Sequence, residues 1–305
     1  MLGQHNLDFP FQFPPPSGQT VSPRWVGDGF IVDEKRAKVL AYDAGDSGWT
    51  DDLTAFHEDN AGDDHYIDKA SRAHALSVLE RALRMPKPVI MDIGCSSGYM
   101  LRMLKERFPG GTVIGADYVA RPLEHLAETL PLTPLLQFNL VKCPLPDRCV
   151  DAVVLLNVLE HIEDDCAAMR QVARILKPGG VAAIEVPAGP QLFDIYDKQL
   201  MHFRRYEMRG FVRKLEQSGL RVARKSHLGF FLYPAFWAAK KQGQRLMNKS
   251  GDLQQRIVAK RMQSGKSSSI MHTVMHLEQA LRNAVYYPIG VRCLVTCESA
   301  HGESV

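Results

Sequence analysis

The stretch VIMDIGCSSGYML, residues 89–101, gives the strongest indication of the fold of this 305-residue chain. It opens with a short apolar run, typical of a buried strand, and continues through Gly94 and Gly98 into a segment with a helical apolar pattern. Glycines at such a turn allow the backbone to approach a ligand closely. We therefore expect these residues to begin an α/β unit whose turn holds a cofactor.

The same rhythm continues along the chain, where apolar runs that predict strands alternate with amphipathic segments that predict helices. We expect further strands at 111–117, 134–140, 149–159, 181–187, 220–231 and 290–299, and helices at 65–84, 98–108, 120–130, 164–176 and 207–218. Continuous apolar strands that alternate with helices predict a parallel sheet covered on both faces. Ligands of such sheets bind beyond the carboxyl ends of the strands.

Three other segments depart from this alternation. Residues 1–24 are rich in proline and predict an extended arm rather than a packed element, and residues 25–64 are acidic and contain glycine. We therefore divide the chain into an arm with an acidic cap segment, residues 1–64, and one domain, residues 65–305. A mostly helical segment at about 230–288 is expected to form a lid or insertion before the last strand.

The bulk composition indicates an ordinary globular protein, with 45% hydrophobic and 23% charged residues. A formal charge of +3 is too small to indicate a nucleic-acid partner. The six cysteines form no C-x-x-C pair, which favours a reducing cytoplasm over a zinc site or disulfide framework. The N-terminus predicts no secretory signal, and the most apolar later stretch, 12 residues at 228–239, is too short to span a bilayer.

Three cofactors could suit the glycine turn. A triphosphate loop needs G-x4-G-K-[ST], but Gly94 and Gly98 enclose three residues and Tyr99 follows them. A dinucleotide turn needs G-x-G-x-x-G, but Ser96 stands where the middle glycine must approach a pyrophosphate. S-adenosylmethionine carries no phosphate and tolerates side chains in the middle of the turn, so it fits best.

Four motifs, in order along the chain and each near a strand end, resemble those of class I S-adenosylmethionine-dependent methyltransferases. They are MDIGCSSG (91–98), GADYV (115–119), CPLPDRCVDAVVLLNVLEHIEDD (143–165) and ILKPGG (175–180). The segment HFRRYEMRGFVRKLEQSGLRV (202–222) further resembles a bacterial branch with H-x-R-R-Y, often associated with sugar or cell-surface glycan pathways. The resemblance covers residues 65–230. It implies a Rossmann-like, mostly parallel sheet of seven strands, the last one antiparallel.

The resemblance also implies which residues bind the cofactor. Asp92 is expected to bind the ammonium group, the backbone of the glycine turn to bind the carboxylate, and Asp117 to accept both ribose hydroxyls. Tyr118 is expected along the adenine. The residues after the third strand match the adenine N6 position, and those after the fourth line the methionine end. The full expected set is Asp92, Gly94, Cys95, Ser96, Gly98, Asp117, Tyr118, Asn139, Leu140, Leu156 and Asn157.

Methyl transfer needs mainly alignment and exclusion of water, and a base helps only where the acceptor must lose a proton. His202, just beyond the fifth strand, is the preferred candidate for that base, followed by Tyr206 and His161. Arg204 and Arg205 could bind a phosphate or carboxylate of the substrate. Two alternatives stay open, namely a capping loop whose arginines pair with local acids, and a structural or methionine-pocket role for His161.

No metal site is expected. The pair Glu160-His161 resembles part of a metal-dependent branch that binds magnesium, but Asn157 stands where that branch has its first carboxylate.

The expected activity is methyl transfer to a small-molecule or glycan-type acceptor, at oxygen. The alternatives are a lipid or quinone acceptor, or a non-catalytic protein that keeps the cofactor fold. The apolar and basic segment 228–249 suits an acceptor pocket, a peripheral contact with an anionic membrane, or a helix that simply packs on the sheet. A nucleic-acid substrate is not expected because the chain lacks the [ND]-P-P-[YF] signature, and the oligomeric state stays open.

Overall fold

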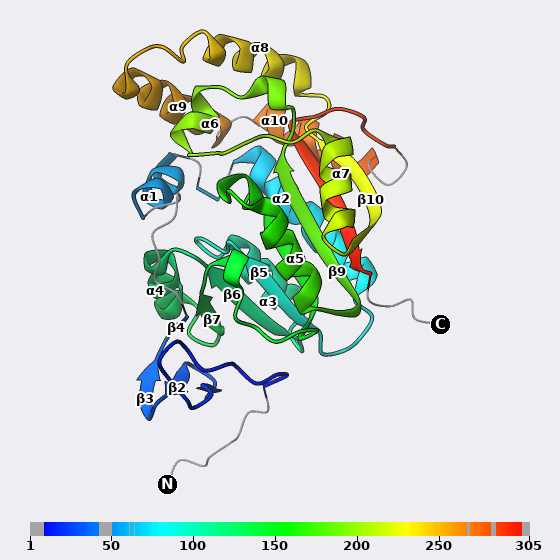
Figure 1. Cartoon of the computed structure of the whole chain (residues 1–305). Helices are drawn as coiled ribbons and strands as arrows, with labels where there is room; N and C mark the ends of the chain where they lie inside the picture. The colour runs from blue at the N-terminus through cyan, green and yellow to red at the C-terminus, as the bar shows by residue number, and fades with distance from the viewer. Residues whose placement is uncertain are drawn as a thin grey trace.

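The structure is a computed structural model that describes residues 9–42, 51–60, 62–63, 65–266, 269–281 and 285–300. A central sheet has helices on both faces, a small three-stranded sheet at one end and a layer of helices at the other (Figure 1). The central strands are β4 (Leu40–Ala41), β5 (Val89–Ile93), β6 (Thr112–Asp117), β7 (Leu135–Gln137), β8 (Val150–Leu156), β9 (Leu176–Pro187), β10 (Leu220–Leu228) and β11 (Arg292–Ser299).

The helices lie where apolar residues recur at helical spacing. The α-helices are α1 (Asp51–Asn60), α2 (Tyr66–Ala82), α3 (Tyr99–Arg107), α4 (Ala120–Thr129), α5 (Asp165–Ile175), α6 (Ile195–Gln199), α7 (Met208–Gln217), α8 (Tyr233–Gln244), α9 (Gly251–Lys266) and α10 (Ser269–Leu281). Short 3-10 turns are η1 (Leu140–Lys142), η2 (Leu159–His161) and η3 (Pro190–Leu192), and the small sheet is formed by β1 (Arg24–Trp25), β2 (Phe30–Val32) and β3 (Lys35–Ala37).

The order of the central sheet is β10-β11-β9-β8-β5-β6-β7-β4. Its strands are parallel except β11, which pairs antiparallel with both β9 and β10, as expected for the last strand. The expected count of seven was wrong, because the described residues form eight strands in this sheet. The eighth is β4, whose Leu40 and Ala41 pair with Leu136 and Gln137 of β7. A two-residue strand is too short to show any alternation, so no pattern in the sequence predicts it.

The N-terminal segment, from residue 9 onward, packs more tightly than the extended arm that the prolines predict. Phe9 and Phe11 contact the ring of Phe13, with centroids 4.5 and 5.0 Å away, and Phe13 also contacts Phe30 at 5.2 Å. Phe13 is only 1% exposed. Three aromatic rings bury enough apolar surface to hold a segment that lacks regular structure.

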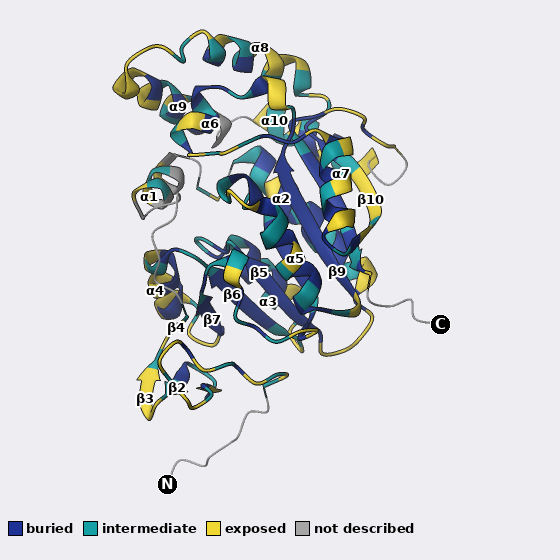
Figure 2. Cartoon of the chain, viewed as in Figure 1, coloured by how far each residue is buried: buried dark blue, intermediate teal, exposed yellow. Residues whose placement is uncertain are grey.

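The core runs through the middle of the sheet, where Figure 2 shows the ribbons of β5 and β9 almost entirely buried. All five residues of β5 are buried, as the apolar run at its position predicts. Helices α6, α8, α9 and α10 form the layer beyond the carboxyl end of β9 (Figure 1). This end of the sheet is where the expected site residues gather.

Candidate functional site

The turn after β5 needs glycine for two local reasons. Gly94 and Gly98 have φ of 75° and 76°, a left-handed conformation that other residues rarely adopt. A Cβ on Gly94 would lie 2.4 Å from Cγ2 of Val158, and one on Gly98 would lie 2.5 Å from Cδ2 of Leu126. Glycine is therefore required at both positions by the packing of the protein itself, in addition to the close approach of a cofactor that the sequence predicted.

The carboxylate of Asp117, at the end of β6, accepts a hydrogen bond from the glycine turn. One carboxylate oxygen accepts from Ser96 N at 2.9 Å, and the other accepts from Val119 N at 3.0 Å. Burial raises the pKa of Asp117, while these N–H bonds act in the opposite direction. A carboxylate offers about four acceptor positions, so Asp117 keeps acceptor capacity for the hydroxyls of a ribose.

Asp92, at the end of β5, carries a buried acceptor that has no internal donor. The residue is 3% exposed, and its Oδ2 has no hydrogen-bond partner among the described residues. Burial, with a further contribution from Asp117, raises the pKa of Asp92 to about 7. Cys95 is also buried, which raises the pKa of its thiol well above the usual range and favours a packing role. An unpaired buried oxygen indicates a binding position for a donor from outside the chain.

The positions expected near adenine lie at the ends of β6 and β7. Tyr118 is partly buried, and its carbonyl accepts from Nε2 of Gln137 at 3.1 Å. Asn139 caps η1, since its Oδ1 accepts from Val141 N at 2.9 Å, and Leu140 behind it is buried. The cap occupies part of the acceptor capacity of Asn139, so its contact with adenine stays a prediction.

The end of β8 leads to a buried carboxylate that the sequence analysis missed. Leu156 is partly buried, and Asn157, with φ of 54°, donates from Nδ2 to Oε1 of Glu185 at 3.0 Å. Arg292 donates to that oxygen at 2.7 Å, and Ser71 Oγ lies 2.9 Å from it. Within the described residues, Oε2 of Glu185 has no partner. Glu185 could have been found as the one charged residue in the apolar strand VAAIEVP.

Glu160 and the two expected histidines lie together beyond β8. The rings of His161 and His202 are 4.7 Å apart, centroid to centroid. Glu160 is fully buried, burial raises its pKa to about 8, and neither carboxylate oxygen has a partner in the described part of the chain. One ligand atom from each of the three lies within 4.8 Å of the others, so this group could hold a cation. Two imidazoles and one carboxylate suit a transition metal better than magnesium.

His202 is held in place by a buried ionic network. Its Nδ1 lies 2.8 Å from Oδ1 of Asp197, and burial lowers the pKa of the ring, so it is neutral near pH 7. Lys240 of α8 donates to Asp197 and Asp194, both at 2.7 Å. Burial alone would raise the pKa of Asp197, but His202, Lys240 and Arg205 hold it well below its usual range. We call Asp194, Asp197, His202, Arg205 and Lys240 the Asp197 network.

The other residues of the H-x-R-R-Y segment bind within the protein. Arg205 is 6% exposed and donates to the carbonyl of Ala188 and to Asp197, both at 2.8 Å. The Tyr206 hydroxyl lies 2.9 Å from Oδ2 of Asp165, and burial raises its pKa above the usual range. Arg204 pairs with the same carboxylate at 3.0 Å. These contacts match the alternative of a capping loop, and the expected substrate contacts of Arg204 and Arg205 stay predictions.

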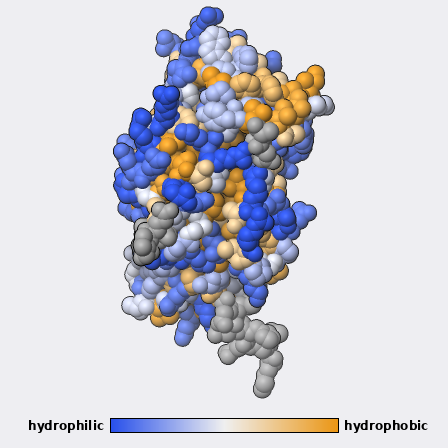
Figure 3. Space-filling view, turned by 90° about the vertical axis from the view of Figure 1, so that its right-hand side faces the viewer, coloured by the Kyte–Doolittle hydropathy of each residue, from blue (hydrophilic) through white to orange (hydrophobic). Residues whose placement is uncertain are grey.

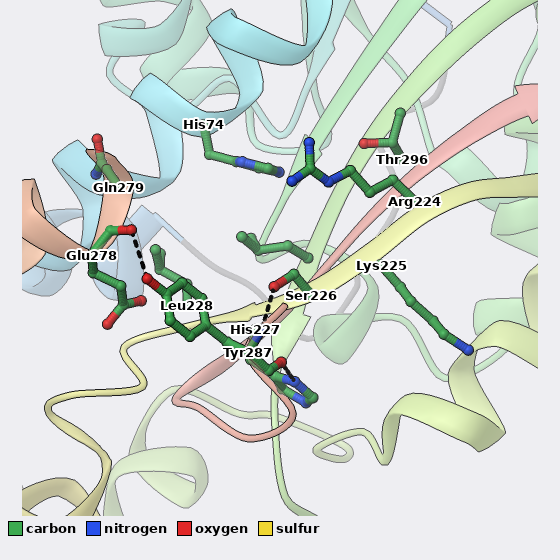
Figure 4. Close-up of a pocket in the computed structure, with 11 residues that line it drawn as sticks. His74, Arg224, Lys225, Ser226, His227, Leu228, Glu278, Gln279, Tyr287 and Thr296 are labelled. Carbon is green, nitrogen blue, oxygen red and sulfur yellow. Dashed lines mark hydrogen bonds between the residues drawn. The ribbon is translucent and has the colours of Figure 1, made fainter. Parts of the chain in front are cut away.

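Two hollows of the structure lie away from the glycine turn. The one in Figure 4, between β10, α2 and α10, has a volume of about 10 Å³, which is room for about one water. A second hollow, of about 430 Å³, lies at the amino end of β8 and is lined by residues that include Phe11, Pro146 and Lys177. Neither includes the glycine turn. The candidate site is therefore identified by its polar groups rather than by a deep cavity.

These polar groups fit S-adenosylmethionine. The partnerless oxygen of Asp92 suits its ammonium group, and the remaining acceptor positions of Asp117 suit its ribose. The backbone between Gly94 and Gly98 needs no middle glycine because no pyrophosphate has to approach it.

Comparison with known proteins gives the same result. A family profile described as a methyltransferase domain matches residues 91–184. A probable S-adenosylmethionine-dependent methyltransferase of Mycolicibacterium smegmatis is 31% identical over 116 residues, which are 38% of this chain and 44% of that protein. A trans-aconitate 2-methyltransferase of an Azoarcus species is 30% identical, over 40% of this chain and 47% of that protein. The matched region thus spans less than half the length of these two relatives.

A demethylmenaquinone methyltransferase of Thermus thermophilus is 29% identical, over 41% of this chain and 61% of that protein. Among solved structures, a proposed sarcosine dimethylglycine methyltransferase of Galdieria sulphuraria superposes with a TM-score of 0.54 at 15% identity, over 82% of this chain and 99% of that one. At that identity the likeness concerns the fold alone. Residues 91–184 of this chain thus match a methyltransferase domain, and the motifs at the ends of β5, β6 and β8 resemble those of class I S-adenosylmethionine-dependent methyltransferases.

Proposed function

We propose that this protein transfers a methyl group from S-adenosylmethionine to a small-molecule or glycan-type acceptor, at oxygen. The observation that carries the proposal is a buried oxygen of Asp92 that has no partner among the described residues, next to the glycine turn and to Asp117. When bound, the cofactor supplies a methyl group already activated on a sulfonium centre. The residues of the chain then have to orient the acceptor, exclude water and remove a proton.

We propose His202 as the base that removes this proton. Its ring is neutral near pH 7, and Asp197 fixes its orientation through Nδ1, two properties that a general base needs. His161, whose ring contacts that of His202, is the second candidate. Tyr206 is less suited because its hydroxyl is engaged by Asp165.

A lipid or quinone acceptor is the second candidate function. It is favoured by large exposed apolar side chains in the helical layer beyond the sheet, among them Phe231, Trp237 and Leu277. The named relatives include one protein named for trans-aconitate and one for demethylmenaquinone, so they do not choose between a polar and an apolar acceptor. Activity that requires detergent or vesicles would favour the apolar one.

Calorimetric titration tests the cofactor. We expect micromolar binding of S-adenosylmethionine and no binding of NAD, with Asp117→Ala weakening the former about tenfold or more, about 1.4 kcal/mol. Asp147→Ala is the matched control, because Asp147 is an exposed aspartate in a surface ion pair with Arg174, and it should leave the affinity unchanged. Binding of NAD instead, or equal effects of both substitutions, would contradict the proposal.

The base is tested by His202→Asn once an acceptor is found. We expect kcat to fall about a hundredfold, with the affinity for S-adenosylmethionine within about twofold of the parent protein. An unchanged kcat would rule His202 out as the base without affecting the cofactor assignment.

A further inference from the structure

Charge is distributed unevenly along this chain. Residues 229–291 contain nine lysines and arginines and two acidic residues, a net charge of +7, whereas the rest of the chain has 28 basic and 32 acidic residues, a net charge of −4. The basic residues that the structure describes as exposed or partly exposed on α8, α9 and the turn between them are Lys241, Arg245, Lys249, Arg256, Lys260 and Arg261. Such a concentration predicts attraction to an anionic surface.

Helix α10 follows these basic residues in the sequence and has an exposed apolar face. Ile270, Leu277 and Leu281, spaced seven and four residues apart, lie on one side of the helix and are 75%, 57% and 40% exposed. On the other side Met275 and Glu278 are 2% and 1% exposed. The helix is therefore anchored by one face and presents aliphatic side chains on the other.

Two neighbouring segments pack against α10 next to Glu278 and carry exposed apolar side chains of their own. The Glu278 carboxylate accepts from the backbone of Gly229 at 2.7 Å and of Phe231 at 3.2 Å, which places the 229–231 loop against α10. Tyr287 donates from its hydroxyl to the Glu278 carbonyl at 2.9 Å and brings residues 285–289 to the same place. We call the exposed side chains of these segments the α10 patch; they are Phe231, Ile270, Leu277, Leu281, Val285, Tyr286 and Ile289.

Cations border this patch on the sheet side. Arg224 and Lys225 of β10 are exposed and line the same small hollow as Glu278 and Tyr287 (Figure 4). Figure 3 shows hydrophobic residues gathered at the upper right of one face of the molecule, with strongly hydrophilic ones beside them. Exposed aliphatic and aromatic side chains next to basic residues are the composition of a surface that rests in the headgroup region of a bilayer.

We propose that the α10 patch docks on an anionic lipid bilayer, with its apolar side chains at the boundary between headgroups and acyl chains. The basic residues of α8, α9 and β10 would face the lipid phosphates. A nucleic acid would use the same cations but leave these aliphatic side chains in water, so the lipid surface fits better. In the described residues no helix has the length and apolar composition to cross a bilayer, which makes the contact peripheral. This inference does not depend on the acceptor or on catalysis.

Vesicle flotation of the full chain tests the proposal. We expect the protein to float with vesicles of phosphatidylcholine that contain about 30% phosphatidylglycerol, and about tenfold less with phosphatidylcholine alone. Raising the salt from about 0.1 M to about 0.5 M should weaken the binding several-fold, because it screens the surface charges. Binding that is equal for both vesicle types would contradict the role of the basic residues.

Variants distinguish vesicle binding through the α10 patch from non-specific hydrophobic adsorption. We expect Leu277→Ser with Leu281→Ser to weaken vesicle binding about tenfold, with an unchanged far-ultraviolet circular dichroism spectrum, because both side chains are exposed. Leu132→Ser is the matched control, since Leu132 is 69% exposed in the loop after α4, outside the patch, and should have no effect. The proposal would be overturned if the wild-type protein did not bind vesicles but formed a dimer that the double variant does not form. The patch would then bind a second copy of the chain. Binding of the double variant at the parent level would also overturn it.

Discussion

The residues proposed for the cofactor, Asp92 and Asp117, and the Asp197 network on the proposed acceptor side use polar groups in opposite ways. On the cofactor side, Asp92 and Asp117 keep acceptor capacity that the described part of the chain does not fill. On the acceptor side, Asp197, Arg205 and Lys240 are buried and satisfy one another. The difference indicates that a position after a strand end is not sufficient for a charged residue to bind a cofactor or substrate. The pairing of its charge inside the protein decides whether it can serve one.

The largest effect on stability should come from a substitution in the Asp197 network. Asp197→Asn removes the charge that Lys240 and Arg205 share, and we expect the free energy of unfolding to fall by about 3–5 kcal/mol, measured by urea denaturation. The control is Asp28→Asn, which breaks an exposed pair with Arg36 and should cost less than about 1 kcal/mol. If both variants lost the same small amount, the Asp197 network would not be what stabilises this side.

The next effect concerns the glycine turn on the cofactor side. Gly94→Ala strains a left-handed residue and also places a Cβ against Val158, so we expect cofactor affinity to fall by about 2 kcal/mol, roughly thirtyfold. Gly179→Ala is matched, because its φ is 73° but nothing lies within 4 Å of the added Cβ. We expect titration to show no change in affinity for the Gly179 variant. Equal losses would mean that backbone strain alone, and not the turn, controls binding.

A smaller effect should appear with pH. The pKa of Asp92 is about 7, raised by burial and by Asp117, and a bound ammonium group favours its charged form. Affinity for S-adenosylmethionine should therefore fall as pH drops through 7, to about a tenth at pH 6 of its value at pH 8. Titrations across this range test the expectation, and Asp92→Asn should flatten the dependence. A parent protein whose affinity does not change would show that Asp92 does not bind the ammonium group.

The smallest effect should follow removal of divalent metals. The group of Glu160, His161 and His202 offers one carboxylate and two imidazoles, whereas magnesium prefers oxygen ligands. We therefore expect dialysis against EDTA, then addition of magnesium, to change activity less than about twofold, about 0.4 kcal/mol. Loss of activity on dialysis that magnesium or a transition metal such as zinc or manganese restores would contradict the expectation that no metal takes part.

Features that depend on neighbouring residues in the sequence were predicted, and features that depend on residues far apart in the sequence were not. The strands and Gly94 were predictable, because an apolar run and a glycine turn are local signals. The comparisons confirmed the resemblance to S-adenosylmethionine-dependent methyltransferases, whose motifs are likewise short and contiguous, whereas the H-x-R-R-Y branch stays a prediction. The cytoplasmic location stays a prediction from cysteine usage.

The remaining features depend on contacts between distant segments. The partners of Arg205 are 8, 17 and 86 residues away in the chain, and those of Glu185 are 28, 107 and 114 residues away. No local pattern encodes such pairs. The packing of the N-terminal phenylalanines was missed for a related reason, since the prolines between them predict an extended segment without showing what it covers. The membrane contact predicted for 228–249 stays a prediction, and the exposed face of α10 becomes evident only when its buried face is known.

The position of β11 has a consequence for how the chain is made. Residues 292–299 form a strand that lies between β9 and β10, more than a hundred residues downstream of the start of β9. While the ribosome is still translating the helical layer, β9 and β10 have no partner between them and expose unpaired backbone groups. Such edges are the surfaces through which nascent chains aggregate or recruit chaperones. The half of the sheet around the glycine turn can form during translation, but the other half has to wait for residue 299.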